Sequence, residues 1–545
     1  MTSRTLGHRA PLLWLVLPLM AGLVLGKAME STAVAWPLAG ALAAAGLAVA
    51  ASGRASRLWA IALVGAMLLG GWASYTLHRQ RLPDWDRLPP REVRLTLRLD
   101  RVFPPTDSRK VSGLATVTRA EGSFRELTGQ RLYFSLMLRR GESPPVRSTV
   151  VTTTGVLAAV PRDAAADSFD SFLDHAGMNF RLTRGRVLGV ERPPTRYRGF
   201  CERAAARLYA LLSLGIASKR PDLTAVYRAM MLGQKHELSD EQNELFMHSG
   251  TMHLFAINGL HIGVVAIALH ALLAALRCPR FAAAMITLGV LWLDVDTTGA
   301  SPSAVRAFLL VAGYQTALVL RRPANGLASL ATAALLTLLT EPMALYSASF
   351  QMSYGVVVVI LAFGLPLGGE LEARWKPFQN LPPATWSWWQ RQLARASRWL
   401  AGALGLGVAA TLVSAVTGAT FFQVFAPGGL VANLVLVPLA MLVIIAGFAS
   451  VTVGLAGAAT LSILFNHAAA VLLWLIDGLI RLGLHVPGVW WPVQWRADWA
   501  APVSFAALLA VVLAGYATGW RRDRGGFWPP LVVTALALIF GVRFG

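Results

Sequence analysis

Two imidazole side chains, those of His253 and His261, lie in a stretch that starts polar and ends in a long apolar run, Met230–Gly263. Between them the chain carries an Asn258–Gly259 break. Polar residues this close to a membrane span need partners or water, because hydrocarbon leaves their hydrogen bonds unsatisfied. The stretch therefore indicates the polar lining of a cavity or channel.

Three interpretations of the histidine pair stay open. The side chains could line a constriction, hydrogen-bond phosphate and pivot a broken helix, with protonation near neutral pH as a modulator. They could instead only satisfy backbone carbonyls around the Asn-Gly break. A metal site would need a further ligand, and Asp294 and Asp296 could approach only through tertiary folding. We expect no metal and no cofactor.

The same stretch resembles the membrane domain of the ComEC family, the competence proteins that pass transforming DNA across the cytoplasmic membrane. The family pattern is Gly-x-x-His-Leu-x-x-Ile-Ser-Gly-Leu-His. The residues in step with it are Gly250, His253, Leu254, Ile257, Gly259, Leu260 and His261. The chain departs at Asn258, where the family usually carries serine.

Further stretches resemble elements of the same family. Gly299–Arg306 ends in an arginine that either faces phosphate in a cavity or snorkels to the headgroups. Gln351 and Ser353, with Tyr354, match a Phe-Gln-Leu-Ser-Phe motif; because they cannot share one helix face, we expect them to bond neighbouring helices. Asn433–Pro438 matches an element in which the proline breaks a helix, which is tolerated beside a cavity or under protein cover.

Composition predicts a polytopic α-helical membrane protein. The chain is 55% hydrophobic and 14% charged, with a mean hydropathy of +0.54. Apolar runs near the length that crosses a bilayer lie at 11–26, 33–51, 58–77, 253–276, 281–297, 303–320, 325–341, 344–365, 399–421, 430–449, 501–520 and 528–543. Residues 451–484 could form one helix or a re-entrant hairpin, so we expect about 11–13 spans.

The distribution of positive charge predicts the orientation. Arg4 and Arg9, the pair Arg277/Arg280, Arg321/Arg322 and the loop 374–398 all fall on one side when the spans alternate. Basic loops favour the cytoplasm, so we expect a cytoplasmic N-terminus and residues 79–252 outside the cytoplasmic (inner) membrane. The net charge of +21 therefore does not by itself indicate nucleic acid. Cys201 and Cys278 fall near opposite faces, which argues against a disulfide.

Residues 79–200 differ from the rest, with 22 Lys and Arg against 13 Asp and Glu and no spanning run. Val93, Leu95, Leu97 and Leu99 alternate at the strand period, and four more strand candidates follow. Five short strands fit a small OB-like barrel, here inserted on the extracytoplasmic side. A short helix over 168–175 precedes the last strand, and Phe169–Gly177 resembles the segment closing the external ComEC domain.

The chain thus divides into N-terminal membrane helices (1–78), the external barrel (79–200), an amphipathic connection with a polar segment (201–252) and the competence-type membrane domain (253–545). On the barrel, single-stranded DNA would need basic and stacking side chains. The candidates are Arg125, Arg131, Tyr133, Arg139 and Arg140. Phe134 belongs to the alternating apolar set and is expected in the core. The barrel could bind DNA or an envelope partner, or serve as a spacer.

The resemblance implies a channel component that admits single-stranded DNA during natural transformation. It also implies a DNA receptor, a separate nuclease and a cytoplasmic motor as partners, and it leaves a homo-oligomer open. The His-x-His-x-Asp-His run of the family's metallo-β-lactamase-like C-terminal domain does not occur here, so we expect a form lacking that domain and no enzyme activity. The alternatives are a secondary transporter of a small solute or lipid, and an envelope assembly factor.

Overall fold

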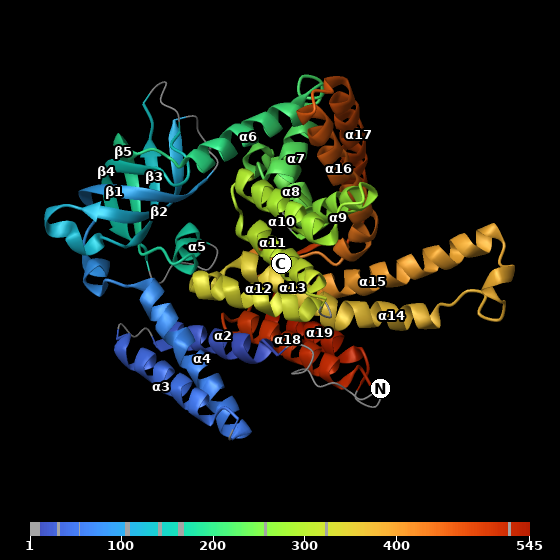
Figure 1. The fold of residues 1–545 in the computed structure, drawn as a ribbon, viewed down its shortest axis with the longest axis horizontal. Coiled ribbons are helices and arrows are strands. Elements are labelled where there is room, and N and C mark those ends of the chain that lie inside the picture. Colours follow the sequence, from blue (N-terminus) through green and yellow to red (C-terminus); the bar gives the residue numbers. More distant parts are fainter. Residues whose placement is uncertain are drawn as a thin grey trace.

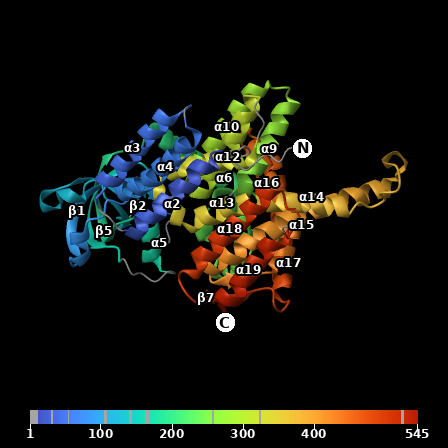
Figure 2. The ribbon, with the colours of Figure 1, turned by 90° about the horizontal axis from the view of Figure 1, so that it is seen from below.

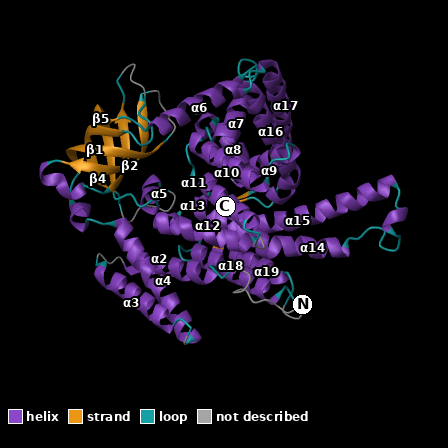
Figure 3. Cartoon of the chain, viewed as in Figure 1, coloured by secondary structure: helices purple, strands orange, loops and turns teal. Residues whose placement is uncertain are grey.

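The computed structural model describes residues 11–29, 33–53, 55–103, 109–139, 144–161, 168–255, 259–321, 325–521 and 525–545. A β-barrel lies at one end of the longest axis and a long helical hairpin projects from the other end (Figures 1 and 2). The remaining helices fill the space between them, and the strands gather mainly in the barrel (Figure 3). The extremes of the molecule are therefore a barrel and a hairpin that lie far apart.

The barrel closes in the order β1-β2-β3-β5-β4, with β3 and β5 parallel and the other pairs antiparallel. Its strands are β1 Arg91–Val102, β2 Lys110–Ala120, β3 Arg131–Met137, β4 Val150–Ala159 and β5 Phe180–Arg192. The alternating residues Val93 to Leu99 and Phe134 are buried in its core, because successive strand residues point to opposite faces. The prediction of a five-stranded barrel is confirmed.

A short helix, α5 (Phe169–His175), lies between β4 and β5, as predicted. The Ser168 side chain accepts a hydrogen bond from the Ser171 backbone N–H and so caps the first turn. Arg79 forms an ion pair with Asp174 and donates to the Met178 carbonyl oxygen at 3.1 Å. These contacts join the barrel to the end of the helix α4 (Ser56–Arg79) that precedes it.

Outside the barrel the described chain is mainly helical, with a small second sheet in the order β6-β7-β8 formed by β6 Val424–Phe425, β7 Trp491–Trp495 and β8 Val542–Phe544. The other helices are α2 Leu13–Met29, α3 Ala35–Ala51, α6 Arg196–Ser213, α7 Pro221–Leu232, α8 Asp240–His248, α9 Gly259–Ala275, α10 Arg280–Thr297, α11 Pro302–Val319, α12 Gly326–Thr340, α13 Ala348–Val359, α14 Leu365–Arg374, α15 Trp388–Phe421, α16 Gly429–Leu455, α17 Ala459–Leu484, α18 Ala500–Thr518 and α19 Trp528–Gly541. Residues 451–484 therefore hold the end of α16 and one helix, not a re-entrant hairpin.

Six helices of the described chain are long and apolar enough to cross a membrane, and five shorter apolar helices accompany them. The six include Ala348–Arg374, in which α13 and α14 continue through a π-helical turn, Ile360–Gly364. Pro366 stands in the first turn of α14. The lack of a backbone N–H is tolerated best at this position of a helix. These lengths support a polytopic helical membrane protein; the expected 11–13 spans stay a prediction.

One apolar cluster joins α7, α9, α10, α11, α16 and α17. A buried polar group lies beside it: the Asn466 side-chain amide donates to the carbonyl oxygens of Leu211 (2.8 Å) and Leu214 (3.0 Å). Ser450 in α16 donates to Asn466 Oδ1 at 2.7 Å. Because such groups are costly to bury without partners, this network fixes α6 against α16 and α17.

The helices α14 and α15 touch backbone to backbone. A Cβ added at Gly405 would collide with the Gly364 carbonyl oxygen and lie 2.7 Å from the Gly368 amide nitrogen. Glycines four residues apart allow such close approach of apolar helices. The hairpin is therefore held by main-chain packing at its base.

Candidate functional site

The polar segment before α9 packs against the start of α16. Gly250 has φ +70°, and a Cβ there would lie 3.3 Å from the Ala426 Cβ; a Cβ at Gly429 would lie 3.6 Å from the Ser249 carbonyl oxygen. Glycine suits Gly250 because other residues rarely adopt this left-handed conformation. The structure thus brings the histidine segment and the Asn433–Pro438 element together.

The two histidines occupy different environments. His253, in a short 3₁₀ turn (Met252–Phe255), is exposed, and its Nδ1 lies 3.1 Å from the Gly250 carbonyl oxygen, to which a proton on Nδ1 is donated. His261 is buried in the first turn of α9, close enough to interact electrostatically with His253. Gly259 begins α9, whereas Asn258 lies outside the described residues.

Arg306 links α11 to α13. Its side chain is 3% exposed, and Nη2 donates to the Ser349 carbonyl oxygen at 2.6 Å and to Ser349 Oγ at 2.7 Å. The guanidinium also lies 5.7 Å from the centre of the Tyr354 ring. Arg306 is therefore held by protein groups rather than extended to the headgroups, and its Nε has no hydrogen-bond partner in the described chain.

The remaining predicted membrane-domain residues differ in their contacts. Gln351 Nε2 donates to the Leu345 carbonyl oxygen at 3.2 Å, just upstream on the same segment, and Ser353 is half-buried. The hydrogen bond between helices is instead made by Tyr354, whose hydroxyl lies 3.0 Å from Thr337 Oγ1 in α12. The expectation that Gln351 and Ser353 bond neighbouring helices stays a prediction; the bond shown for Gln351 goes to the short 3₁₀ helix before α13, Pro342–Tyr346.

The element Asn433–Pro438 does not end a helix. Pro438 lies inside α16, which continues to Leu455, so the expected break is absent from this described helix. Proline lacks an N–H, and the Leu434 carbonyl oxygen loses the donor that a regular helix would provide. Asn433 Oδ1 is buried without a hydrogen-bond partner among the described residues. Both groups thus put unmet hydrogen-bonding capacity near the histidine segment.

The helices that carry these residues share one core. Ile262 of α9, Ala304 of α11 and Leu436 of α16 belong to the same buried apolar cluster. Each stands one to three residues from His261, Arg306 or Asn433. Motifs that lie 45 to 172 residues apart in the sequence are therefore carried by helices of one packed unit.

A second polar site joins the barrel end of the molecule to the helices. The Asp296 side chain is 2% exposed at the end of α10. It accepts hydrogen bonds from Arg198 Nη1 at 2.8 Å and the Tyr197 hydroxyl at 2.9 Å, and Arg147 Nη1 lies 3.7 Å away. Arg147 comes from the β3–β4 connection and Tyr197 and Arg198 from α6. Asp296 thus holds three separate elements together.

This site adds residues that the sequence analysis missed. Asp294 and Asp296, considered there only as distant partners of the histidines, both belong to the last turns of α10, and Asp296 pairs with Arg198. The partners Arg147 and Arg198 are more than 95 residues away from Asp296. The aspartates at the end of an apolar run were the one available signal. They do not indicate which arginines pair with Asp296.

The predicted basic residues of the barrel are dispersed. Arg125 and Arg139 are exposed, Arg131 contacts His78 at the end of α4, and Arg140 lies outside the described residues. Tyr133 packs between Phe103 (6.4 Å, stacked) and Phe169 (5.0 Å, edge-on). Tyr133 is therefore half-buried in an aromatic cluster, which leaves less of its ring for a base.

A row of arginines across β1, β4 and β5 was missed. In the register, Arg94 and Arg186 both oppose Thr154, and Arg98 and Arg192 both oppose Val150. All four arginines are exposed. We call them the barrel arginine face. Period-two alternation puts them on the outer surface, but only the strand pairing shows that the arginines of β1 and β5 flank the same residues of β4.

Three acidic residues interrupt the barrel arginine face. Glu92 accepts a hydrogen bond at 3.4 Å from Thr154, which lies between Arg94 and Arg186. Asp100 pairs with Arg98 Nε at 3.1 Å. Glu191 accepts hydrogen bonds from Thr152 at 2.6 Å and Thr96 at 3.1 Å, and these bonds lower the pKa of Glu191. Glu191 is therefore ionised at neutral pH, but the arginines outnumber the carboxylates.

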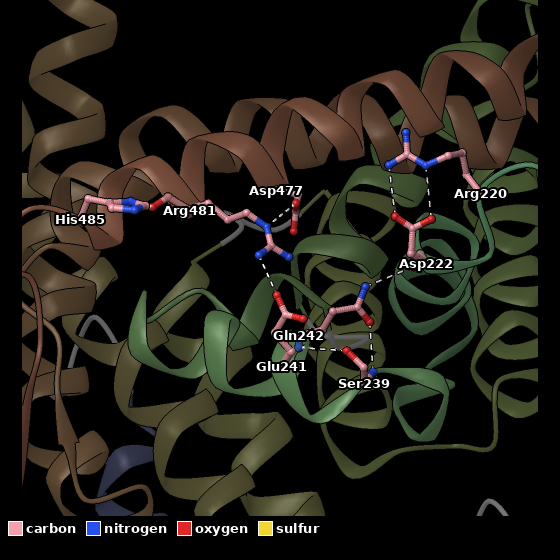
Figure 4. A network of polar contacts seen from close by, with 8 residues as sticks. All are labelled: Arg220, Asp222, Ser239, Glu241, Gln242, Asp477, Arg481 and His485. Carbon is pink, nitrogen blue, oxygen red and sulfur yellow. Dashed lines mark hydrogen bonds and ion pairs between the residues drawn. The ribbon is translucent and has the colours of Figure 1, made fainter.

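An exposed network positions α8, the helix that leads into the histidine segment (Figure 4). Arg481 of α17 reaches Asp477 (2.8 Å) and Glu241 of α8 (2.7 Å). Ser239 and Gln242 form a capping box, and Gln242 also donates to the Asp222 carbonyl oxygen at 3.3 Å. Each exposed ion pair contributes less than about 1 kcal/mol, so the network orients α8 more than it stabilises the fold.

Comparison with known sequences matches residues 230–517, more than half of the chain, to the sequence profile of a family described as Competence protein. The chain belongs to this family. The matched range contains the histidine segment, Arg306, the Gln351 motif and α16. The match confirms the resemblance to the ComEC family.

Two curated relatives align over shorter stretches. "ComE operon protein 3" of Bacillus subtilis (strain 168) is 31% identical over 136 residues, which cover 25% of this chain and 18% of the relative. An "Uncharacterized protein" of Aquifex aeolicus (strain VF5) is 30% identical over 145 residues, 26% of this chain and 34% of the relative. This competence-family chain thus aligns with only about a fifth to a third of the curated relatives it matches. No solved structure matches it.

Proposed function

We propose that this competence-family protein is a multi-pass inner-membrane channel component that conducts single-stranded DNA into the cytoplasm. The observation that carries the proposal is the packing of the helices that bear the family motifs: Leu254 and Phe255 of the histidine segment lie in one buried cluster with residues of α9, α11 and α16, the helices of His261, Arg306 and Asn433. Polar residues gathered inside a helical membrane domain are a feature of substrate pathways.

The barrel supports the same proposal from the other end. Its strand order, with a parallel β3–β5 pair, fits the OB type, whose barrels bind single strands on a basic face. The barrel would receive the strand, and the helices below it would conduct it. The barrel and the α14–α15 hairpin lie at opposite ends of the molecule, which supports opposite sides of the membrane (Figure 2). A separate receptor, nuclease and cytoplasmic motor would complete the pathway.

The decisive experiment measures DNA uptake, with surface binding separated from internalisation, in a strain lacking this chain and in variants. His253→Ala and His261→Ala are each expected to lower internalised DNA at least tenfold, with surface binding unchanged, because both residues lie in the membrane domain and not on the barrel. His485→Ala is the control: this exposed histidine at the C-terminal end of α17 donates to the Arg481 carbonyl oxygen (2.7 Å) of its own turn.

Normal internalisation by both histidine variants, at normal protein levels, would show that the pair only packs, and the site assignment would fail. Normal uptake in the deletion strain would contradict the channel proposal itself. Labelled DNA gives both readouts in one culture. DNA that external nuclease removes is bound at the surface, and DNA that it leaves intact has been internalised.

The barrel arginine face is expected to bind the incoming strand. Arg94→Glu with Arg186→Glu should weaken binding of the purified full-length protein to a single-stranded oligonucleotide at least tenfold. It should also reduce the log–log salt slope by about 1.4, at about 0.7 per phosphate contact. Fluorescence anisotropy across a salt series measures both quantities.

The matched variant is Arg125→Glu with Arg139→Glu, which changes the same charge at the predicted but dispersed positions. A larger loss of binding from this second pair would place the DNA interface around β3, which Arg125 and Arg139 flank. An equal loss from both would indicate attraction by net charge rather than by a face.

The orientation can be tested independently of DNA. A reporter inserted after residue 140 is expected to be external, and one near residue 385, between α14 and α15, cytoplasmic. A pair of enzymatic reporters active on only one side of the membrane gives the answer. Both reporters on one side would mean that an odd number of spans is misassigned.

A further inference from the structure

The α14–α15 hairpin extends beyond the other helices at the end of the molecule away from the barrel (Figure 1). Its outer part holds the exposed tryptophans Trp388 (75% exposed) and Trp399 (54% exposed). Between them on α15 stand Arg391, Arg395 and Arg398. Large apolar side chains on a projecting element mark contact sites more often than solvated surface.

The spacing sets four of these residues in one line. Trp388, Arg391, Arg395 and Trp399 follow steps of three, four and four, so they fall on one face of the helix. At 1.5 Å per residue the line is about 17 Å long. Ala394 and Ala401 are buried on a different side of α15. We call the four residues the Trp–Arg stripe.

Lipid cannot cover the whole stripe. α15 has 34 residues, about 51 Å, whereas a span needs about 20 residues. If the apolar C-terminal part of α15 crosses the bilayer, the helix reaches about 17 Å further, from Trp399 to Trp388. A headgroup layer is only about 5–8 Å thick on each side. Trp399 then lies at the interface and Trp388 lies in water beyond it.

The charges select an anionic partner. Residues 388–399 carry three arginines and no acidic residue. In α14, Glu370 is already paired with Arg374 at 2.9 Å. Arg395 and Arg398 contact only Gln392 Oε1 (3.5 Å) and the Ala394 carbonyl oxygen (3.3 Å), and no ion pair with a carboxylate is found for the three arginines within the described chain. Their charge is available to phosphate.

We propose that the Trp–Arg stripe binds single-stranded nucleic acid on the side of the membrane opposite the barrel, where it would receive the strand leaving the channel. Indole rings stack with bases of any sequence, and arginines between them neutralise the backbone phosphates. Two arginines flanked by two tryptophans along about 17 Å match a strand of a few nucleotides. The side chains of the stripe are the ground for nucleic-acid binding. That the stripe receives the strand after translocation rests on the proposed function.

The test uses the full-length protein in detergent, carrying Arg94→Glu and Arg186→Glu so that the barrel contributes little binding. A fluorescent 20-nucleotide oligo-dT is the probe, and anisotropy gives its Kd. Trp388→Ala with Arg395→Glu should raise the Kd at least tenfold. Trp389→Ala with Lys376→Glu is the matched control: Trp389 is exposed next to the stripe but packs on Phe378 (5.5 Å), and reversing the charge of Lys376, exposed between α14 and α15, tests attraction by charge alone.

An unchanged Kd for the stripe variant overturns the proposal, and so does an equal loss in the control. The same two variants are added to vesicles with and without anionic phospholipid. Loss of vesicle binding together with an unchanged Kd for oligo-dT would identify a lipid anchor and also overturn it. Uptake in the deletion strain tests the proposed function separately: oligo-dT binding by the stripe in a protein dispensable for uptake would refute only that function.

Discussion

Replacing Arg306 with alanine is expected to lower DNA internalisation at least tenfold while the protein still inserts and surface binding persists. The substitution leaves the Ser349 hydroxyl and carbonyl oxygen without their charged donor between α11 and α13. Each lost charge-assisted hydrogen bond costs about 1.5–3 kcal/mol in a buried site. The same nuclease-protection assay measures the effect.

Arg306→Lys keeps the charge but offers one compact donor group in place of the planar fork. It should recover part of the internalisation, because one of the two contacts to Ser349 can re-form. Ser349→Ala, which removes only the hydroxyl, should have the smallest effect of the three. A lysine variant as inactive as the alanine variant, or an alanine variant with normal uptake, would contradict a linking role for this arginine.

Asp296→Ala is expected to destabilise the junction of α6, α10 and the β3–β4 connection by about 3 kcal/mol. Removing one partner of a buried ion pair leaves the other charge uncompensated, here Arg198 and in part Arg147. Thermal unfolding of the purified protein in detergent measures the loss. Increased proteolysis near residue 195 should accompany it, since α6 begins there.

The double variant Asp296→Ala with Arg198→Ala supplies the sharper comparison. Because it removes the stranded charge as well, it should be more stable than the single Asp296 variant, and the two substitutions should not add. Arg374→Ala, which breaks the exposed pair with Glu370 on α14, is the control and should cost less than about 1 kcal/mol. Additive losses would mean that Asp296 and Arg198 act independently.

The sequence predicts the barrel well because its signal is local. Alternation from Val93 to Leu99 and the burial of Phe134 follow from the pleat of a strand, and Ser168 caps α5 through its own side chain. The positions of the apolar helices along the chain follow from the lengths of the apolar runs. Each of these features depends on residues within one element, so no partner has to be known.

Contacts between distant elements could not be predicted in the same way. Asp296 has three partners, which come from the β3–β4 connection and from α6. Nothing near Asp296 in the chain distinguishes Arg198 from other arginines. The barrel arginine face depends on strand register, which alternation does not give. Pro438 was expected to end a helix, but α16 has enough packing on both sides of the proline to continue.

The π-turn at Ile360–Gly364 sets the rotational phase of the hairpin. A turn of this kind accommodates one extra residue, and one residue corresponds to about 100° of rotation about the helix axis. Gly364 and Gly368 face α15 only with that phase, while Tyr354 on the other side of the turn faces α12. Shortening this segment by one residue would keep the apolar length almost intact. It would nevertheless turn the hairpin's glycine contact away from α15, or Tyr354 away from Thr337.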